Sequence, residues 1–149
     1  MNRFGRRLAA ATGTLAVVSA LGTGTAQAQD SGPLYFGTGA FQCAIFADGA
    51  VGCDAPGYRL QYTWLPVPFP VNEVVIDQPW LPAHPTFTPG SDYTRPGNNP
   101  SLYEVRTGDG TWGPYVEYAG ARCEAGFHGS FTCSSKGRAF SAYNYTITA

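Results

Sequence analysis

The sequence predicts an all-β protein: a small disulfide-stapled β-sandwich or barrel with hairpins and a long proline-rich loop. Four cysteines form two equally spaced pairs, and several short segments alternate apolar with polar residues. With 12 prolines and 19 glycines, the chain shows no convincing amphipathic helix after its N-terminal segment. A chain of 149 residues has room for one such domain.

Residues 1–28 have the pattern of a cleavable secretory signal. Three arginines and no acidic residue precede an uncharged, mostly apolar run over residues 8–21, and Ala-Gln-Ala follows at 26–28. This run is shorter than the roughly 20 residues that a membrane span needs, so we expect no membrane span. An uncleaved helix is the alternative, and the Arg6-Arg7 pair leaves general and twin-arginine export open. We therefore expect residues 29–149 to form a single secreted β-rich domain, either free outside the cell or associated with the cell envelope.

The aromatic, glycine-rich segment 34–41 leads into the first of two matching cysteine hairpins. The cysteines of each pair are ten residues apart, and the pairs are Cys43/Cys53 and Cys123/Cys133. Asp48-Gly49 and His128-Gly129 stand at the same offset inside the two pairs. A three-residue turn ending in glycine, which adopts positive φ freely, places each cysteine directly opposite its partner. Each hairpin can therefore close its own disulfide, which stabilises a protein by roughly 3 kcal/mol for a loop this short.

The cysteines allow other interpretations as well. Four cysteines permit three disulfide pairings, and the spacing favours the two local bridges without excluding crossed ones. A zinc site is the rival interpretation, but its usual spacing of two to four residues between ligands is absent. We expect no metal site, because an exported chain leaves the reducing cytosol and its cysteines then form disulfides.

The remaining elements follow from alternation and from proline. Tyr58–Trp64 and Phe140–Thr148 alternate large apolar and polar residues, which is typical of strands. Residues 66–100 are proline-rich and aromatic, which predicts a long ordered loop around a β-branched island at 71–76. Two further segments flank Gly108-Asp109-Gly110 and predict a third hairpin; they are residues 101–106 and 111–118. A minor helix near Ser134–Ala142 is an alternative for the end of the chain.

The two cysteine hairpins share more than their spacing. At an offset of 80 residues, five positions are identical: Tyr35/Tyr115, Cys43/Cys123, Gly49/Gly129, Cys53/Cys133 and Gly57/Gly137. A decayed internal duplication and the convergence of two hairpins both explain this match. Convergence is slightly favoured, because most of these residues belong to turns or bridges.

The first hairpin carries a local resemblance. The segment from Cys43 to Asp54 reads Cys-Ala-Ile-Phe-Ala-Asp-Gly-Ala-Val-Gly-Cys-Asp, and it resembles a hairpin of small exported actinobacterial proteins of unknown function. The resemblance implies a secreted or cell-envelope location and no particular activity. The segment is also similar to a phrase of some β-propeller repeats. It covers about a tenth of the chain and lacks the Trp-Gly that usually follows, and a propeller needs several repeats, so we expect no propeller.

No motif in the sequence predicts catalysis, and we expect no enzyme, no cofactor and no catalytic residue. His84 lies between prolines and His128 lies in a predicted turn, and neither accompanies a nucleophile motif. Ten acidic residues offer no conspicuous pair for glycoside hydrolysis, and Asp109 lacks the further ligands of a calcium loop. The formal net charge of −1 provides no basic excess for a nucleic-acid partner.

Aromatic residues are the most suggestive feature for function, at 14% of the chain against 13% charged residues. Most of them are expected in the core, but a few exposed rings would suit a sugar or a partner protein. The candidate binding residues are Trp64, Trp80 and Trp112. We therefore expect a secreted, monomeric, non-enzymatic domain that binds a cell-wall glycan or an unknown extracellular protein. The alternative is a secreted inhibitor of extracellular proteases that presents the proline-rich segment as a rigid loop.

Overall fold

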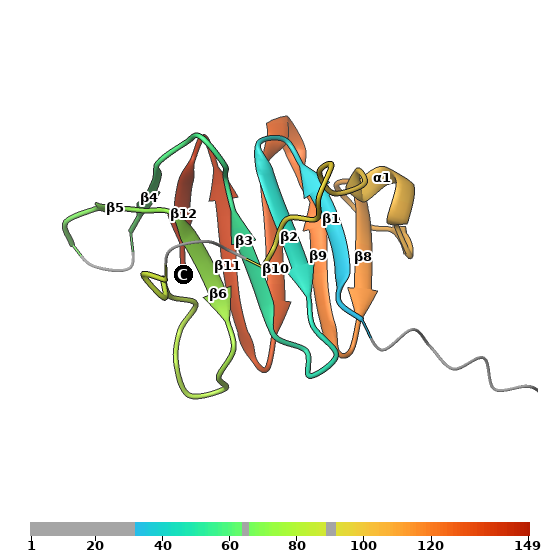
Figure 1. Cartoon of the computed structure of the whole chain (residues 1–149), viewed down its shortest axis with the longest axis horizontal. Coiled ribbons are helices and arrows are strands. Elements are labelled where there is room, and N and C mark those ends of the chain that lie inside the picture. The colour runs from blue at the N-terminus through green and yellow to red at the C-terminus, as the bar shows by residue number, and fades with distance from the viewer. Residues whose placement is uncertain (1–31, 64–65, 89–91) are drawn as a thin grey trace, which may run out of the picture.

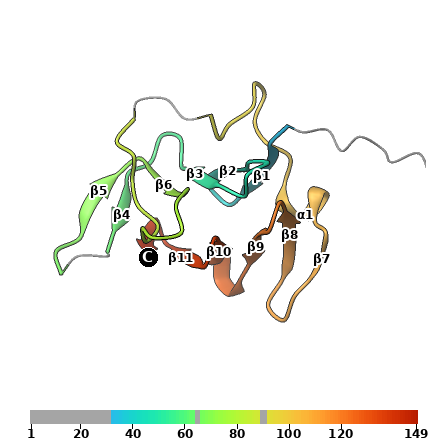
Figure 2. The same cartoon turned by 90° about the horizontal axis from the view of Figure 1, so that it is seen from below.

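The computed structural model describes residues 32–63, 66–88 and 92–149, and these residues form a sandwich of two β-sheets (Figures 1 and 2). In strand order, the smaller sheet contains β1 (Leu34–Thr38), β2 (Phe41–Ile45), β3 (Val51–Asp54) and β6 (Glu73–Ile76). The larger sheet, also in strand order, contains β5 (Phe69–Val71), β4 (Leu60–Tyr62), β12 (Thr146–Thr148), β11 (Arg138–Tyr143), β10 (Phe131–Ser135), β9 (Ala121–Ala125), β8 (Pro114–Tyr118) and β7 (Gly108–Asp109). The prediction of an all-β fold is confirmed, and of its two forms the sandwich is correct, since the sheets do not close into a barrel.

Both cysteine hairpins have the predicted register. Cys43 pairs with Cys53 across β2 and β3, and Cys123 pairs with Cys133 across β9 and β10. Each pair is a disulfide with its Cα atoms 4.1 Å apart, so the local pairing is confirmed and the zinc interpretation is wrong. In the first turn the N–H of Phe46 donates to the carbonyl of Ala50, as a three-residue loop requires.

The repeat of 80 residues extends to a whole three-stranded meander. The offset carries β1 onto β8, β2 onto β9, and β3 onto the first four residues of β10. The register is conserved too, since Phe36 faces Cys43 in the smaller sheet and Val116 faces Cys123 in the larger one. The match therefore includes strand pairing and core positions as well as turn and bridge residues, which favours internal duplication over convergence.

The two meanders contribute to one shared core. Phe41 of the smaller sheet meets Phe131 of the larger one edge to face, with ring centroids 4.8 Å apart. Phe131 also contacts Phe140 of β11, and the four cysteines are fully buried in the same cluster. In the larger sheet, the inward residues alternate with outward, mostly polar ones, as expected when one face is buried. In the smaller sheet the outward residues Ala44, Gly52 and Val75 are buried as well, because that outer face is also covered.

One predicted hairpin is partly wrong. Residues 101–106 are not a strand, because they contain the short helix α1 (Leu102–Val105). Ser101 and Glu104 form a capping box, in which each side chain accepts a hydrogen bond from the backbone of the opposite end of the first turn. The hairpin is formed instead by β7 and β8, so Gly108-Asp109 belongs to a strand and the turn lies beyond it.

The end of the chain is also divided differently from the prediction. Phe140–Thr148 contains the last four residues of β11 and the whole of β12. Asn144 and Tyr145, which both have positive φ, separate the two strands. The minor helix expected at Ser134–Ala142 is wrong, because a tight turn at Lys136-Gly137 joins β10 to β11 there. The strand predicted at Tyr58–Trp64 is shorter, since β4 ends at Tyr62. A 3-10 turn, η1 (Phe127–Gly129), forms the tip of the second cysteine hairpin.

The described parts of the proline-rich segment form β5, β6 and a strap over the outer face of the smaller sheet (Figure 2). We use the name strap for residues 86–88 and 92–99; residues 89–91 lie outside the described residues. The side-chain amide of Asn99 donates to the carbonyls of Phe36, Cys43 and Tyr93, which ties the strap to β1 and β2. The ring of Tyr93 lies directly over Gly52, where a Cβ would collide with it. The predicted long ordered loop is therefore present, with strand segments inside it.

Candidate functional site

The predicted tryptophans do not form one site. Trp64 lies outside the described residues. Trp80 follows β6 and is 68% exposed, and its neighbour Pro79 accepts a hydrogen bond from Arg138 at the start of β11. Trp112 is 71% exposed in the turn between β7 and β8, at the edge of the larger sheet and separated from β11 by β10 and β9. Trp112 stands beside a hollow of the surface.

The hollow beside Trp112 has a volume of about 220 Å³ and lies on the outer face of the larger sheet. Trp112 borders it together with polar side chains of β9 and β10, which are Arg122, Glu124, Thr132 and Ser134. An aromatic ring beside a few convergent polar groups is a common composition for a small-ligand site. We call this hollow the Trp112 site.

Two glycines allow the β7–β8 turn to lie close to β9. A Cβ on Gly113 would be 2.6 Å from the carbonyl oxygen of Ala125, and one on Gly110 would collide with the carboxylate of Glu124. The N–H of Gly110 donates to the carbonyl of Gly113 over 2.8 Å and closes the turn. A larger residue at Gly113 would push the turn away from the backbone of β9, whereas one at Gly110 would displace the side chain of Glu124, so Gly113 sets how close the turn that carries Trp112 lies to the sheet.

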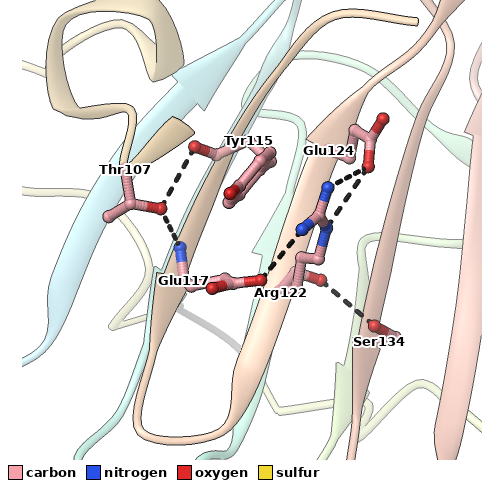
Figure 3. Close-up of polar contacts among 6 residues, drawn as sticks. All are labelled: Thr107, Tyr115, Glu117, Arg122, Glu124 and Ser134. Carbon is pink, nitrogen blue, oxygen red and sulfur yellow. Dashed lines mark hydrogen bonds and ion pairs between the residues drawn. The ribbon is translucent and has the colours of Figure 1, made fainter. Parts of the chain in front are cut away.

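Arg122 organises the polar part of the Trp112 site (Figure 3). Its Nη2 donates to Oε2 of Glu124 over 2.7 Å, and its Nη1 donates to Oε1 of Glu117 over 2.9 Å. Its guanidinium carbon lies 3.4 Å from the ring centroid of Tyr115, a close cation–π contact. The hydrogen bonds from Glu124 and Glu117 raise the pKa of the Arg122 guanidinium above its ordinary value. Two carboxylates and one guanidinium give this cluster a formal charge of −1.

The edge of the sheet holds this cluster in place (Figure 3). The hydroxyl of Thr107 accepts a hydrogen bond from the N–H of Glu117 over 2.8 Å and lies 3.4 Å from the carbonyl oxygen of Tyr115. On the other side, the hydroxyl of Ser134 lies 3.5 Å from the carbonyl oxygen of Arg122. The backbones of β8 and β9 are therefore braced on both sides of the arginine.

Sequence reasoning identified Trp112 but missed the charged residues around it. Glu117, Arg122 and Glu124 occur in no recognised motif. The available signal is the alternation of β9, Ala-Arg-Cys-Glu-Ala, in which Arg122 and Glu124 share the face opposite Cys123. Glu117 joins them because the register places it opposite Arg122, which depends on the turn between β8 and β9.

A second hollow, of about 230 Å³, lies under the strap on the outer face of the smaller sheet. It contains the carboxylates of Glu73, Asp77 and Asp92. Glu73 is buried and accepts hydrogen bonds from the hydroxyl of Thr86 and the N–H of Thr88, so it holds the strap. Burial, followed by the nearby carboxylates, raises the pKa of Tyr93 in this hollow. Among the residues that the structure describes, no group of three or more His, Cys, Asp or Glu is placed to hold a metal ion.

The two histidines have structural surroundings. The backbone of His84 forms a β-bridge with that of Val75, and Nδ1 of the His84 ring lies 3.0 Å from the carbonyl oxygen of Pro82. His128 lies at the tip of the second cysteine hairpin, as predicted, with φ of 53° and its ring against Phe127. Asp109, considered for calcium, lies in β7 with its carboxylate 3.8 Å from Arg106.

No protein-family model, curated protein or solved structure matches this chain. The resemblance of the first hairpin to exported actinobacterial proteins thus stays a prediction. Within the described ranges, no helix is long and apolar enough to cross a membrane.

Proposed function

We propose that this chain is a non-enzymatic binding domain that acts outside the cell and recognises a glycan at the Trp112 site. The observation that carries the proposal is the highly exposed ring of Trp112 beside a hollow lined with carboxylate, guanidinium and hydroxyl groups. A flat aromatic face suits the apolar face of a sugar ring, and the polar groups suit its hydroxyls.

Two features support an extracellular location. Residues 1–28 have the pattern of a secretory signal, although they lie outside the described residues. The two disulfides join β2 to β3 and β9 to β10, and such bridges persist in oxidising compartments. The bridge between Cys123 and Cys133 also holds β9, which carries Arg122 and Glu124, in a fixed register, and this lowers the ordering cost of binding.

The test is co-sedimentation of the oxidised protein with insoluble cell walls and polysaccharides, followed by titration of the bound class with intrinsic tryptophan fluorescence. Trp112→Ala is expected to weaken binding about tenfold or more, as for a central aromatic contact, and Trp112→Phe to retain most of it. Trp80→Ala is the matched control, because Trp80 is equally exposed but lies away from the hollow. The proposal fails if the wild type binds no polysaccharide or if Trp112→Ala binds like Trp80→Ala.

Protease inhibition is the second candidate, and one observation favours it. The proline-rich segment exposes large apolar side chains at Trp80, Leu81 and Phe87 while its strap is tied to the smaller sheet. An exposed apolar segment on a rigid support is what an inhibitory loop needs. Micromolar inhibition of a serine protease or metalloprotease by a wild type that binds no polysaccharide would replace the glycan proposal with this one.

A further inference from the structure

A continuous row of outward side chains crosses the larger sheet from the Trp112 site. The strand registers place Tyr115 opposite Glu124, Glu124 opposite Thr132, Thr132 opposite Ser141, and Ser141 opposite Thr148. The row therefore runs perpendicular to the strands, from β8 to β12, with one residue from each strand. All five side chains lie on the outer face, because their neighbours along each strand are buried.

The far part of this row consists of short hydroxyl side chains. The hydroxyls of Thr132 and Ser141 lie 3.2 Å apart in a hydrogen bond, and those of Thr63 and Thr148 lie 3.1 Å apart in another. Each hydroxyl retains capacity for a further hydrogen bond, since it offers one donor and two acceptor positions. This part of the row therefore offers polar, uncharged groups.

Surface hollows follow the row from Glu124 on β9 to Thr148 on β12. Thr132 borders the Trp112 site and also a third hollow, of about 420 Å³, which continues over Ser141 and Thr148 on the same face of the larger sheet. The two hollows meet at this shared residue. A ligand that starts at Trp112 thus has a path along the row toward β12.

The charges along the path indicate the chemistry of the ligand. Nε and Nη2 of Arg122 donate to Glu124 and Nη1 donates to Glu117, so few of its donors remain for an anionic ligand. A phosphate, sulfate or uronate would also approach two carboxylates in a cluster with a formal charge of −1. A neutral chain rich in hydroxyls meets neither obstacle.

We infer that the ligand of the Trp112 site is an extended, neutral polysaccharide chain that lies across the strands along this row. The inference rests on the proposed function and adds the charge, the direction and the length of the ligand. Four strand intervals of about 4.8 Å make a path of about 19 Å, long enough for roughly four pyranose rings.

The test uses β-1,4-linked glucose and N-acetylglucosamine oligomers from two to six units, with oligogalacturonates as the anionic counterparts. Affinity is expected to rise at least tenfold from dimer to tetramer and then to level off, and neutral oligomers are expected to bind more tightly than anionic ones. Ser141→Arg is expected to abolish the gain with length, because the arginine side chain would obstruct the hollow toward β12, which Ser141 borders. Ser141→Ala is the milder variant, expected to reduce the gain.

Ala139→Arg is the matched control, since Ala139 is exposed on the same face of β11 but borders neither hollow. Neutral oligomers that bind equally at every length, or a Ser141→Arg variant that behaves like Ala139→Arg, would overturn the inference and leave glycan binding intact. Tighter binding of the oligogalacturonates would overturn the neutral ligand. Absence of binding to every oligomer and insoluble polysaccharide would overturn the proposed function itself.

Discussion

Arg122 has a positioning role in the candidate site. It contacts two carboxylates and one aromatic ring, and all three partners come from the same pair of strands. Ion pairs at a solvent-exposed position contribute little to stability, because water and salt screen them. Their value here lies in geometry: they hold Tyr115, Glu117 and Glu124 in one arrangement beside Trp112.

Asp48 is the residue whose charge bears most clearly on folding. Its Oδ1 accepts the N–H of Ala50 over 2.9 Å within the first cysteine hairpin, and its Oδ2 lies 3.2 Å from Nζ of Lys136 in the other sheet. The hydrogen bond from Ala50, reinforced by Lys136, holds the pKa of Asp48 below its ordinary value. The carboxylate therefore links a local turn to the contact between sheets.

Asp48→Ala is expected to lower the free energy of unfolding by about 1 kcal/mol at pH 7, through loss of the turn hydrogen bond. Asp48→Asn keeps an acceptor for Ala50 but loses the charge, so its loss should be smaller. A lowered folded-state pKa contributes stability above the unfolded value of about 3.9, and that contribution disappears as the pH falls through the folded value. Urea denaturation at pH 7 and pH 2.5 measures this contribution as the difference in free energy of unfolding between wild type and Asp48→Asn. A difference that is as large at pH 2.5 as at pH 7 contradicts the prediction.

At the scale of elements, the two cysteine hairpins are equivalent parts of one repeated meander. Each disulfide closes a loop of the same length, and each lies fully buried on the inner face of its sheet. The chain-entropy contribution of a disulfide depends on loop length, so the two bridges should contribute equally by that mechanism.

Replacing both cysteines of either hairpin with alanine is expected to lower the free energy of unfolding by about 3 kcal/mol. The two double variants, Cys43→Ala/Cys53→Ala and Cys123→Ala/Cys133→Ala, should differ little from each other in urea denaturation. Each variant is also reduced and compared with the fully reduced wild type; since neither then has a bridge, the remaining difference measures the packing loss apart from cross-linking. A loss confined to one hairpin would show that the halves of the repeat are energetically unequal.

At the scale of the whole molecule, the two sheets depend on each other. Phe131 contacts Phe41 across the sandwich and Phe140 within its own sheet. At one end of the sandwich, the buried hydroxyl of Ser135 donates to the carbonyl of Gly49 over 2.5 Å. The inner face of one sheet therefore cannot be exposed to water without exposing the inner face of the other sheet.

Phe131→Ala is expected to lower the free energy of unfolding by about 3–5 kcal/mol, since it leaves a cavity between the sheets. Phe131→Leu, which keeps most of the volume, should cost less. Far-UV and near-UV circular dichroism should give coincident denaturation curves in the wild type and both variants, as one cooperative unit requires. Curves that separate would indicate that one sheet unfolds before the other.

The sequence by itself determined the local features of this protein. Period-2 alternation, the equal cysteine spacing and the turn dipeptides predicted the β class and both hairpin registers, because each depends on residues within about a dozen positions. They favoured the two local disulfides without excluding crossed ones, and the structure decided between the pairings. Trp112 was also identified as a candidate from the sequence. The helix α1 was missed even though its capping box is local, because a run of four residues carries almost no periodic signal.

Only the tertiary structure decided which segments meet. The parallel pairing of β12 with β4 joins residues about 85 positions apart in the chain. The strap is held on the smaller sheet by the hydrogen bond from the side-chain amide of Asn99 to the carbonyl of Phe36. The row from Tyr115 to Thr148 follows from the order of strands in the larger sheet. The physical reason is that strand order and sheet packing are selected by burial of the shared core, to which residues from all parts of the described chain contribute at once.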